Sequence, residues 1–155
     1  MSNRNAGLTA ACRSVAILLV AGFTIAGCRT TPEATKPAGA VTSASLEEQW
    51  GIRIASLRLT AAGQMIDFRY RIVDPAKAAP LVDRKLNPQL IDQSSRMALA
   101  VPAAPKVGAL RQTSVKPLAG RTYFVLFGNQ QHLVNSGSKV TVVIGAFRVE
   151  NLIVE

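Results

Sequence analysis

Basic side chains are concentrated in one interval of this chain, and they are the residues best suited to bind an anion. No carboxylate occurs between Asp92 and Glu150. A surface with charge of one sign attracts polyanions, and both arginine and lysine bind phosphate and carboxylate groups. We predict an anion-binding site in or at the end of the long segment 102–121, formed by Lys106, Arg111, Lys116 and Arg121. The alternative is that these cations only keep the surface hydrated.

A second group of basic residues alternates with apolar residues in segments that have the pattern of strands. It consists of Arg53, Arg58, Arg69 and Arg71. Neighbouring strands would place these arginines on one exposed sheet face together with Asp67. Such a face could bind carboxylate or phosphate groups, but a set of cross-strand ion pairs and solvated side chains is the favoured interpretation.

Residues for catalysis or metal binding are scarce. His132 is the only histidine, and Met65 and Met97 could join it in a soft copper site. The three residues are far apart in sequence, however, and methionine more often fills a core. Serines lie in turn-like segments, and no pair of acids stands out. We therefore expect no enzyme activity, no cofactor and no metal site. The alternative is an enzyme or metal-handling accessory protein whose site is assembled from scattered residues.

The first 27 residues have the three parts of an export signal. Arg4 and Arg13 precede an apolar run over residues 15–26, which is shorter than the roughly 20 residues of a stable membrane-spanning helix. The segment Ile25-Ala26-Gly27-Cys28 resembles the lipobox of bacterial lipoproteins. The resemblance implies a signal peptide over residues 1–27 and fatty acyl chains, such as palmitate, on Cys28.

This resemblance predicts where the protein works. Each buried methylene contributes about 0.8 kcal/mol, so several acyl chains would hold the protein on a membrane permanently. In Gram-negative bacteria an aspartate after the lipidated cysteine favours the inner membrane, whereas Arg29 implies the outer membrane, facing the periplasm. The expected partners are the membrane, through lipid on Cys28, and an anionic envelope component or another envelope protein. Export and the lack of aromatic residues among the cations argue against nucleic acid.

The mature chain is predicted to divide into a linker and one domain. Residues 28–45 contain the lipidated cysteine and a stretch with almost no large apolar residue, which predicts a disordered tether. Residues 46–155 form the domain, which has no cysteine and therefore no disulfide. Cys12 lies in the predicted signal peptide and Cys28 is the predicted lipidation site, so both cysteines precede the domain.

Short alternating strands dominate the domain. Residues 66–72 alternate apolar and charged side chains, whereas the runs 122–127 and 140–144 are apolar on both faces and predict central strands. A hairpin is expected over 89–101, and Asp74-Pro75 predicts a short helical turn. The fold is thus predicted to be all-β, an immunoglobulin-like antiparallel sandwich of seven to eight strands, with a small barrel as the alternative. Taken together, the sequence predicts a non-catalytic binding or assembly module of the cell envelope.

Overall fold

The computed structural model describes residues 43–155. The predicted signal peptide (1–27), the lipidation of Cys28 and the linker as far as residue 42 concern residues outside this range. The first half of the described chain contains α1 (Ser43–Trp50), β1 (Ile52–Thr60), β2 (Met65–Ile72), α2 (Pro75–Ala78), the 3-10 helix η1 (Ala79–Val82), β3 (Gln89–Asp92) and β4 (Ala98–Ala100). The second half contains β5 (Ala103–Ala104), β6 (Gly108–Ala109), β7 (Thr122–Gly128), β8 (Lys139–Ile144) and β9 (Phe147–Ile153).

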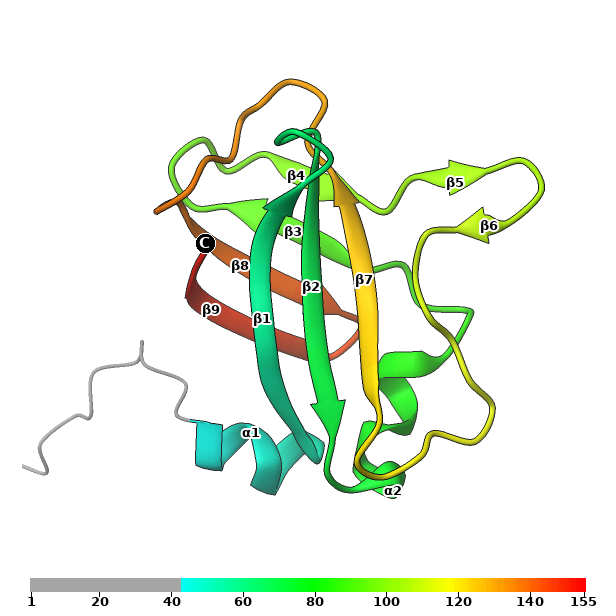
Figure 1. Cartoon of the computed structure of the whole chain (residues 1–155). Helices are drawn as coiled ribbons and strands as arrows, with labels where there is room; N and C mark the ends of the chain where they lie inside the picture. Colours follow the sequence, from blue (N-terminus) through cyan, green and yellow to red (C-terminus); the bar gives the residue numbers. More distant parts are fainter. Residues whose placement is uncertain (1–42) are drawn as a thin grey trace, which may run out of the picture. The chain divides into compact units, whose positions relative to one another are not determined.

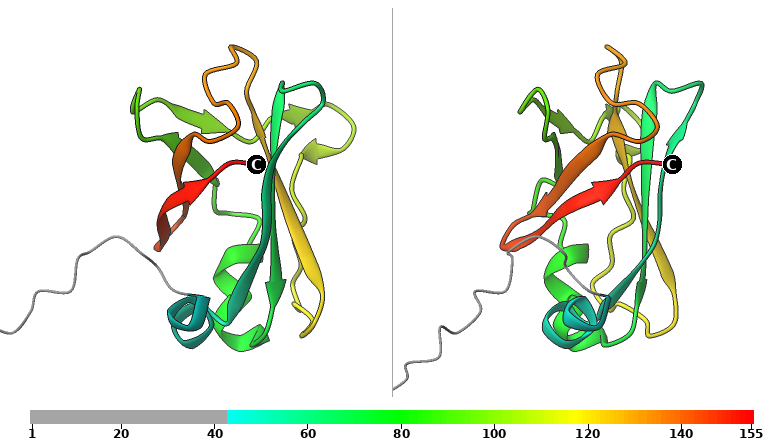
Figure 2. Two further views of the ribbon diagram at one scale, coloured as in Figure 1. Left: turned by 60° about the vertical axis from the view of Figure 1, so that its left-hand side comes forward. Right: turned by 90° about the vertical axis from the view of Figure 1, so that its left-hand side faces the viewer.

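The strands form two main antiparallel sheets that face each other (Figures 1 and 2). The strand order is β1-β2-β7 in the first sheet and β4-β3-β8-β9 in the second, while β5 and β6 form a separate two-stranded ribbon. The chain thus crosses between the sheets after β2, after the ribbon and after β7, in the Greek-key manner of many sandwiches. The predicted all-β, sandwich-like fold is confirmed. In that prediction the term immunoglobulin-like refers to two packed antiparallel sheets and not to membership of the immunoglobulin family.

The core lies between the sheets, where alternating side chains meet. In β2 the four predicted inward residues, Ile66, Phe68, Tyr70 and Ile72, are completely buried. β8 lies between β3 and β9 and is buried along most of its length, as expected for a central strand. In β1 the alternation of side chains between the two faces shifts at a β-bulge between Ile54 and Ser56. Hydrophobic periodicity therefore set both the register and the inward face.

β7 differs from the prediction of a central strand buried on both faces. Its buried residues alternate with exposed or half-buried ones, and it lies at one end of its sheet. The segment 110–112 pairs with the edge of β7 through an antiparallel bridge between Arg111 and Val125. The amide of Gln112 donates to the carbonyl of Phe124 at 2.9 Å, and Leu126 donates to Leu110 at 3.0 Å. The segment 102–121, predicted to be irregular, thus contributes both this pairing and the β5–β6 ribbon.

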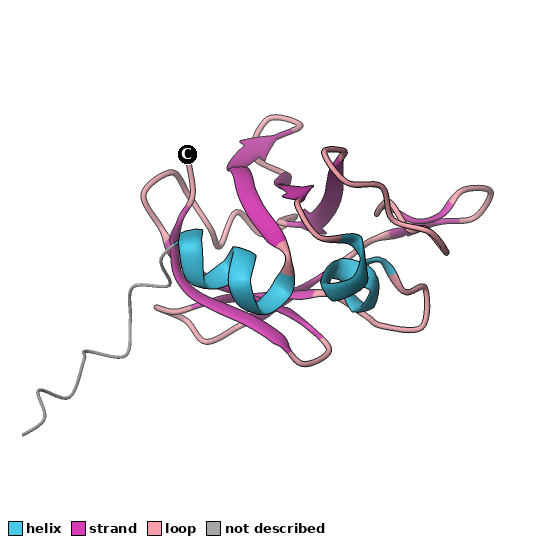
Figure 3. Ribbon diagram, turned by 90° about the horizontal axis from the view of Figure 1, so that it is seen from below, coloured by secondary structure: helices cyan, strands magenta, loops and turns pink. Residues whose placement is uncertain are grey.

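Two helices cover one end of the sandwich (Figure 3). α1 begins within the predicted tether of residues 28–45 and continues into the predicted domain. The reason is packing, because Leu46 and Trp50 lie one turn apart on one helix face. Leu46 is buried, and the Trp50 ring meets Phe147 edge-on with centroids 5.4 Å apart. The helix thereby closes the gap between the sheets at this end.

The predicted helical turn at Asp74-Pro75 is confirmed. The Asp74 carboxylate accepts from the amide of Ala76 at 2.9 Å and Lys77 at 3.4 Å, and Pro75 occupies the first turn of α2. α2 ends at Ala78, and Pro80 lies in the first turn of η1, where proline is tolerated. η1 therefore extends the helical segment to Val82. The residues that follow Val82 line the surface described below.

The predicted hairpin is formed by β3 and β4, and its turn depends on Asp92. This buried carboxylate accepts hydrogen bonds from the hydroxyls of Ser94 and Ser95 and from the Ser95 amide. Burial alone would raise the pKa of Asp92, but these hydrogen bonds outweigh it and hold the pKa below its ordinary value. Asp92 is therefore a charged turn-forming residue.

Candidate anion-binding site

The four cations predicted to bind an anion do not share one site. Lys106 lies in the exposed turn of the β5–β6 ribbon, and Lys116 is exposed in the segment between β6 and β7. Arg121 precedes β7, with its guanidinium carbon 5.8 Å from the centroid of the Tyr123 ring. Arg111, in contrast, is only 9% exposed. The first three can meet a partner in solution, whereas the fourth has a different role.

Arg111 links the segment before β7 to the chain that follows η1. Its guanidinium donates to the backbone carbonyl of Leu86, to that of Leu81 at 2.9 Å and to that of Asp83 at 3.1 Å. Burial lowers the pKa of Arg111, although the nearby Tyr70 and Asp83 partly compensate. Arg111 is one of the four residues predicted to bind an anion, and in the structure both of its terminal nitrogens donate to backbone carbonyls. Only its Nε lacks a hydrogen-bond partner.

Tyr70 supports the same connection from the core. Its hydroxyl donates to the carbonyl of Leu81 at 3.4 Å, the same oxygen that accepts from Arg111. Burial raises the pKa of Tyr70 to about 12, so the phenol stays neutral and remains a donor at physiological pH. The turn after η1 is therefore held by one neutral and one charged donor.

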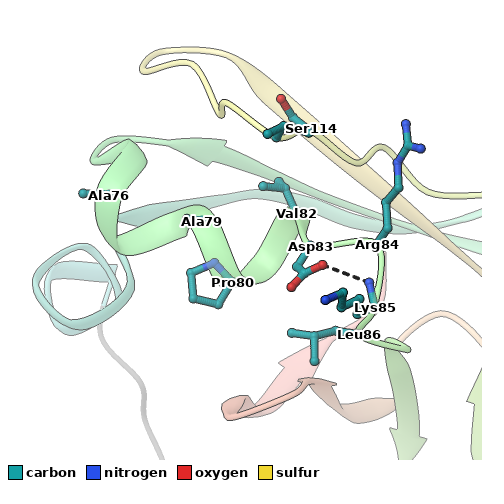
Figure 4. A pocket seen from close by; sticks show the side chains of 10 residues that line it. Ala76, Ala79, Pro80, Val82, Asp83, Arg84, Lys85, Leu86 and Ser114 are labelled. Atoms are coloured by element: carbon teal, nitrogen blue, oxygen red, sulfur yellow. Dashed lines mark hydrogen bonds between the residues drawn. The ribbon is translucent and has the colours of Figure 1, made fainter.

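Two hollows lie on either side of this connection. The larger has a volume of about 660 Å³ and is mostly apolar, with η1 and the residues after it facing Ser114 and Val115 (Figure 4). The smaller has a volume of about 390 Å³, and its lining includes Val107, Arg111 and Thr113. Arg84 and Leu86 line both hollows. The two hollows are therefore neighbouring parts of one surface.

Arg84 is the cation that joins the hollows. Its Nε donates to the hydroxyl of Thr113 at 3.3 Å, which positions the guanidinium across the gap between the two walls. Lys85 lies beside it and also lines the larger hollow. Among residues 43–155 the only acid that lines either hollow is Asp83, whose carboxylate accepts from the Lys85 amide at 2.9 Å (Figure 4). A phosphate or carboxylate group would meet donors there and little opposing charge.

We call this surface the cationic side and define it by Arg84, Lys85, Lys106 and Lys116. It contains two of the predicted site residues. Sequence reasoning missed Arg84 and Lys85 because they precede the carboxylate-free interval and stand next to Asp83. The usable signal was their adjacency directly after a helical turn, where side chains point away from the core.

No protein-family model, curated protein or solved structure matches this chain.

The arginines of the first sheet mostly form ion pairs. The Asp67 carboxylate is buried and contacts Arg69 at 2.8 Å and Arg58 at 3.9 Å, while Arg53 contacts Glu47 at 2.6 Å. These contacts agree with the favoured interpretation of this face. They also explain how a carboxylate on the outer face of β2 becomes buried, since arginine side chains cover it.

The residues weighed for metal chemistry lie outside the cationic side. His132 is exposed in the turn after β7, Met65 is half-buried and Met97 is exposed. Within residues 43–155 no three or more His, Cys, Asp or Glu side chains gather into a group that could hold a metal ion. In the same range no helix is long and apolar enough to cross a membrane.

Proposed function

We propose that this protein is a cell-envelope lipoprotein whose domain is a non-catalytic binding or assembly module in the periplasm. The lipobox-like segment ending at Cys28 supports a lipid anchor, and Arg29 supports the outer membrane in a Gram-negative host. The sandwich supplies a rigid scaffold that carries a binding surface on its loops. The partner is an anionic component of the envelope.

The observation that carries the binding role is the position of Arg84 between the two hollows. Its guanidinium is held by Thr113 and lines both hollows, so it presents an oriented fork of donors. Lys85 lines the larger hollow, and Lys106 and Lys116 are the sequence neighbours of Val107 and Val115, which line the smaller and the larger hollow. Such an arrangement attracts an anionic partner and orients it at one place.

The anchor is tested by replacing Cys28 with serine. We expect complete loss of acylation, because serine has no thiol for the diacylglycerol to attach to. The measurement is the intact mass of the protein isolated from its native membrane, compared with the wild-type chain. An unchanged acyl mass in C28S would contradict the anchor, as would an unmodified first methionine in the wild-type protein.

The binding surface is tested with a triple variant, Arg84→Gln, Lys106→Gln and Lys116→Gln. The matched control removes the same charge from exposed residues elsewhere: Arg96→Gln, Lys139→Gln and Arg148→Gln. With inorganic polyphosphate as probe, we expect the cationic-side variant to bind about 100-fold more weakly, since each of the three charged hydrogen bonds contributes about 1 kcal/mol. The wild-type affinity should fall with added salt. Equal losses in both triple variants would show that overall charge, and not this surface, determines binding.

The same two variants are suited to crosslinking in intact cells. If the cationic side holds the partner, the crosslinked species should disappear in the R84Q/K106Q/K116Q variant and persist in the control. Identification of that species by mass spectrometry would name the partner directly.

A further inference from the structure

Two segments of the cationic side hold large apolar side chains in solvent. Val107 lies in the turn of the β5–β6 ribbon and is 77% exposed, and Val115 lies between β6 and β7 and is 94% exposed. Both segments project on the β7 side of the molecule, at the right in Figure 1. Single exposed valines are ordinary, but each of these is next to a lysine in the sequence. Val107 follows Lys106, and Val115 precedes Lys116. The pairing of valine with lysine therefore occurs at two projecting positions of one surface.

The two positions belong to one continuous surface. Val107 lines the smaller hollow, Val115 lines the larger hollow, and Arg84 lines both. The surface between the valines therefore contains an oriented guanidinium and two concave regions that can receive polar groups. Exposed valines and neighbouring ammonium groups match the acyl boundary and the phosphate level of a lipid layer, and the guanidinium of Arg84 at the hollows suits a headgroup phosphate.

We propose that the cationic side docks on an anionic lipid bilayer. Val107 and Val115 enter the boundary of the acyl chains, and Lys106 and Lys116 extend their ammonium groups to the phosphates. Arg84 binds a headgroup phosphate at the hollows. The proposal rests on the proposed function, because it names the partner of the same surface. An acidic protein is less well matched, since the exposed valines stand at loop tips and do not form a flat patch.

The predicted anchor is compatible with this contact. α1 begins on the side of the domain away from the β5–β6 ribbon (Figures 1 and 3). The chain from Cys28 to Ser43 can extend about 50 Å at most, at about 3.3 Å per residue. That reach allows the cationic side to contact the bilayer that holds the lipid, so the docking is a second, reversible membrane contact.

The test uses the chain from Arg29 to Glu155, which lacks the lipid but keeps all of the described residues, 43–155. Binding is measured by co-sedimentation with vesicles of equal parts phosphatidylcholine and phosphatidylglycerol, and with vesicles of phosphatidylcholine alone. The apolar variant is Val107→Ser with Val115→Ser. Its control, Met97→Ser with Ile153→Ser, removes exposed apolar side chains from the second sheet and its hairpin.

We expect V107S/V115S to bind the anionic vesicles about 10-fold more weakly than wild type, because two apolar side chains no longer enter the layer. Its binding to polyphosphate should be unchanged. The M97S/I153S control should bind both probes like wild type. R84Q/K106Q/K116Q should lose about 100-fold on anionic vesicles, given about 1 kcal/mol for each basic residue at an anionic surface. Thermal unfolding verifies that each variant is folded.

The outcomes separate this proposal from the proposed function. Docking on an anionic bilayer would be overturned if V107S/V115S bound the anionic vesicles as tightly as the wild-type protein does. It would also be overturned if the wild-type protein bound neutral and anionic vesicles equally. The proposed function would still stand if the triple variant lost polyphosphate binding. Crosslinking of wild type to an acidic protein through the cationic side, without vesicle binding, would also overturn the bilayer proposal. Undiminished polyphosphate binding by the triple variant would instead remove the anion-binding surface itself.

Discussion

Replacing Arg111 by methionine should lower the free energy of unfolding by about 3–5 kcal/mol, because it removes three charged hydrogen bonds and takes the guanidinium donor from the carbonyls of Asp83 and Leu86. The wild-type guanidinium donates to the carbonyls of Leu81, Asp83 and Leu86, and methionine has a similar length but no donor. Urea unfolding followed by circular dichroism measures the change. Limited proteolysis should also show earlier cleavage within residues 102–121, since this segment loses its connection to the turn after η1.

Two further variants control this prediction. Arg111→Lys keeps the charge but has one ammonium group, which cannot reach all three carbonyls, so it should be destabilised less than the methionine variant. Lys106→Met removes an exposed cation from the same segment and should change stability by less than about 0.5 kcal/mol. If R111M were as stable as K106M, the structural role of Arg111 would be wrong and its assignment to an anion site would have to be reconsidered.

Replacing Asn129 by alanine should lower the free energy of unfolding by about 3 kcal/mol, the second largest effect that we expect. The amide nitrogen of this completely buried side chain donates to the carbonyls of Gly63 and Val134, each at 2.8 Å, and its oxygen accepts from the Val134 amide at 3.1 Å. Alanine would leave these three backbone groups unpaired inside the protein. The measurement is again urea unfolding, with thermal unfolding as a second method.

Asn135 offers a matched control for Asn129. It is an exposed asparagine in the same connection, and its side chain makes one long hydrogen bond of 3.5 Å to the carbonyl of His132. Asn135→Ala should therefore change stability by less than about 0.5 kcal/mol. Comparable losses for the two asparagines would show that the buried network does not stabilise the β1–β2 turn and the β7–β8 connection as argued.

Much of the fold could be predicted because it follows from local alternation. The charged and apolar positions of β2 have a period of two, so one face must be buried and the other wet. Asp74 and Pro75 specify a helix start by their own backbone preferences. The polar run between residues 92 and 96 likewise marks the hairpin turn, since its short side chains bond to the local backbone. Signals of this kind require no knowledge of distant residues.

The site could not be predicted because its residues meet only through the fold. Arg111 donates to carbonyls 25 to 30 residues away in the chain, and nothing in its neighbours distinguishes it from Lys106 or Lys116. Arg84 reaches Thr113 across a separation of 29 residues. α1 was missed for a related reason. Its hydrophobic positions are few, and its stability comes from the contact of Trp50 with Phe147, far along the chain.

The buried Arg111 also affects how the hollows can bind. Arg111 lines the smaller hollow, and its hydrogen bonds tie its own segment to the carbonyls of Leu81, Asp83 and Leu86. A ligand entering there meets walls that are already in place, and little conformational entropy is lost on association. Among residues 43–155 the buried cation Arg111 therefore has a structural role beside the proposed binding surface, while the exposed Arg84 is the arginine proposed to contact the anion.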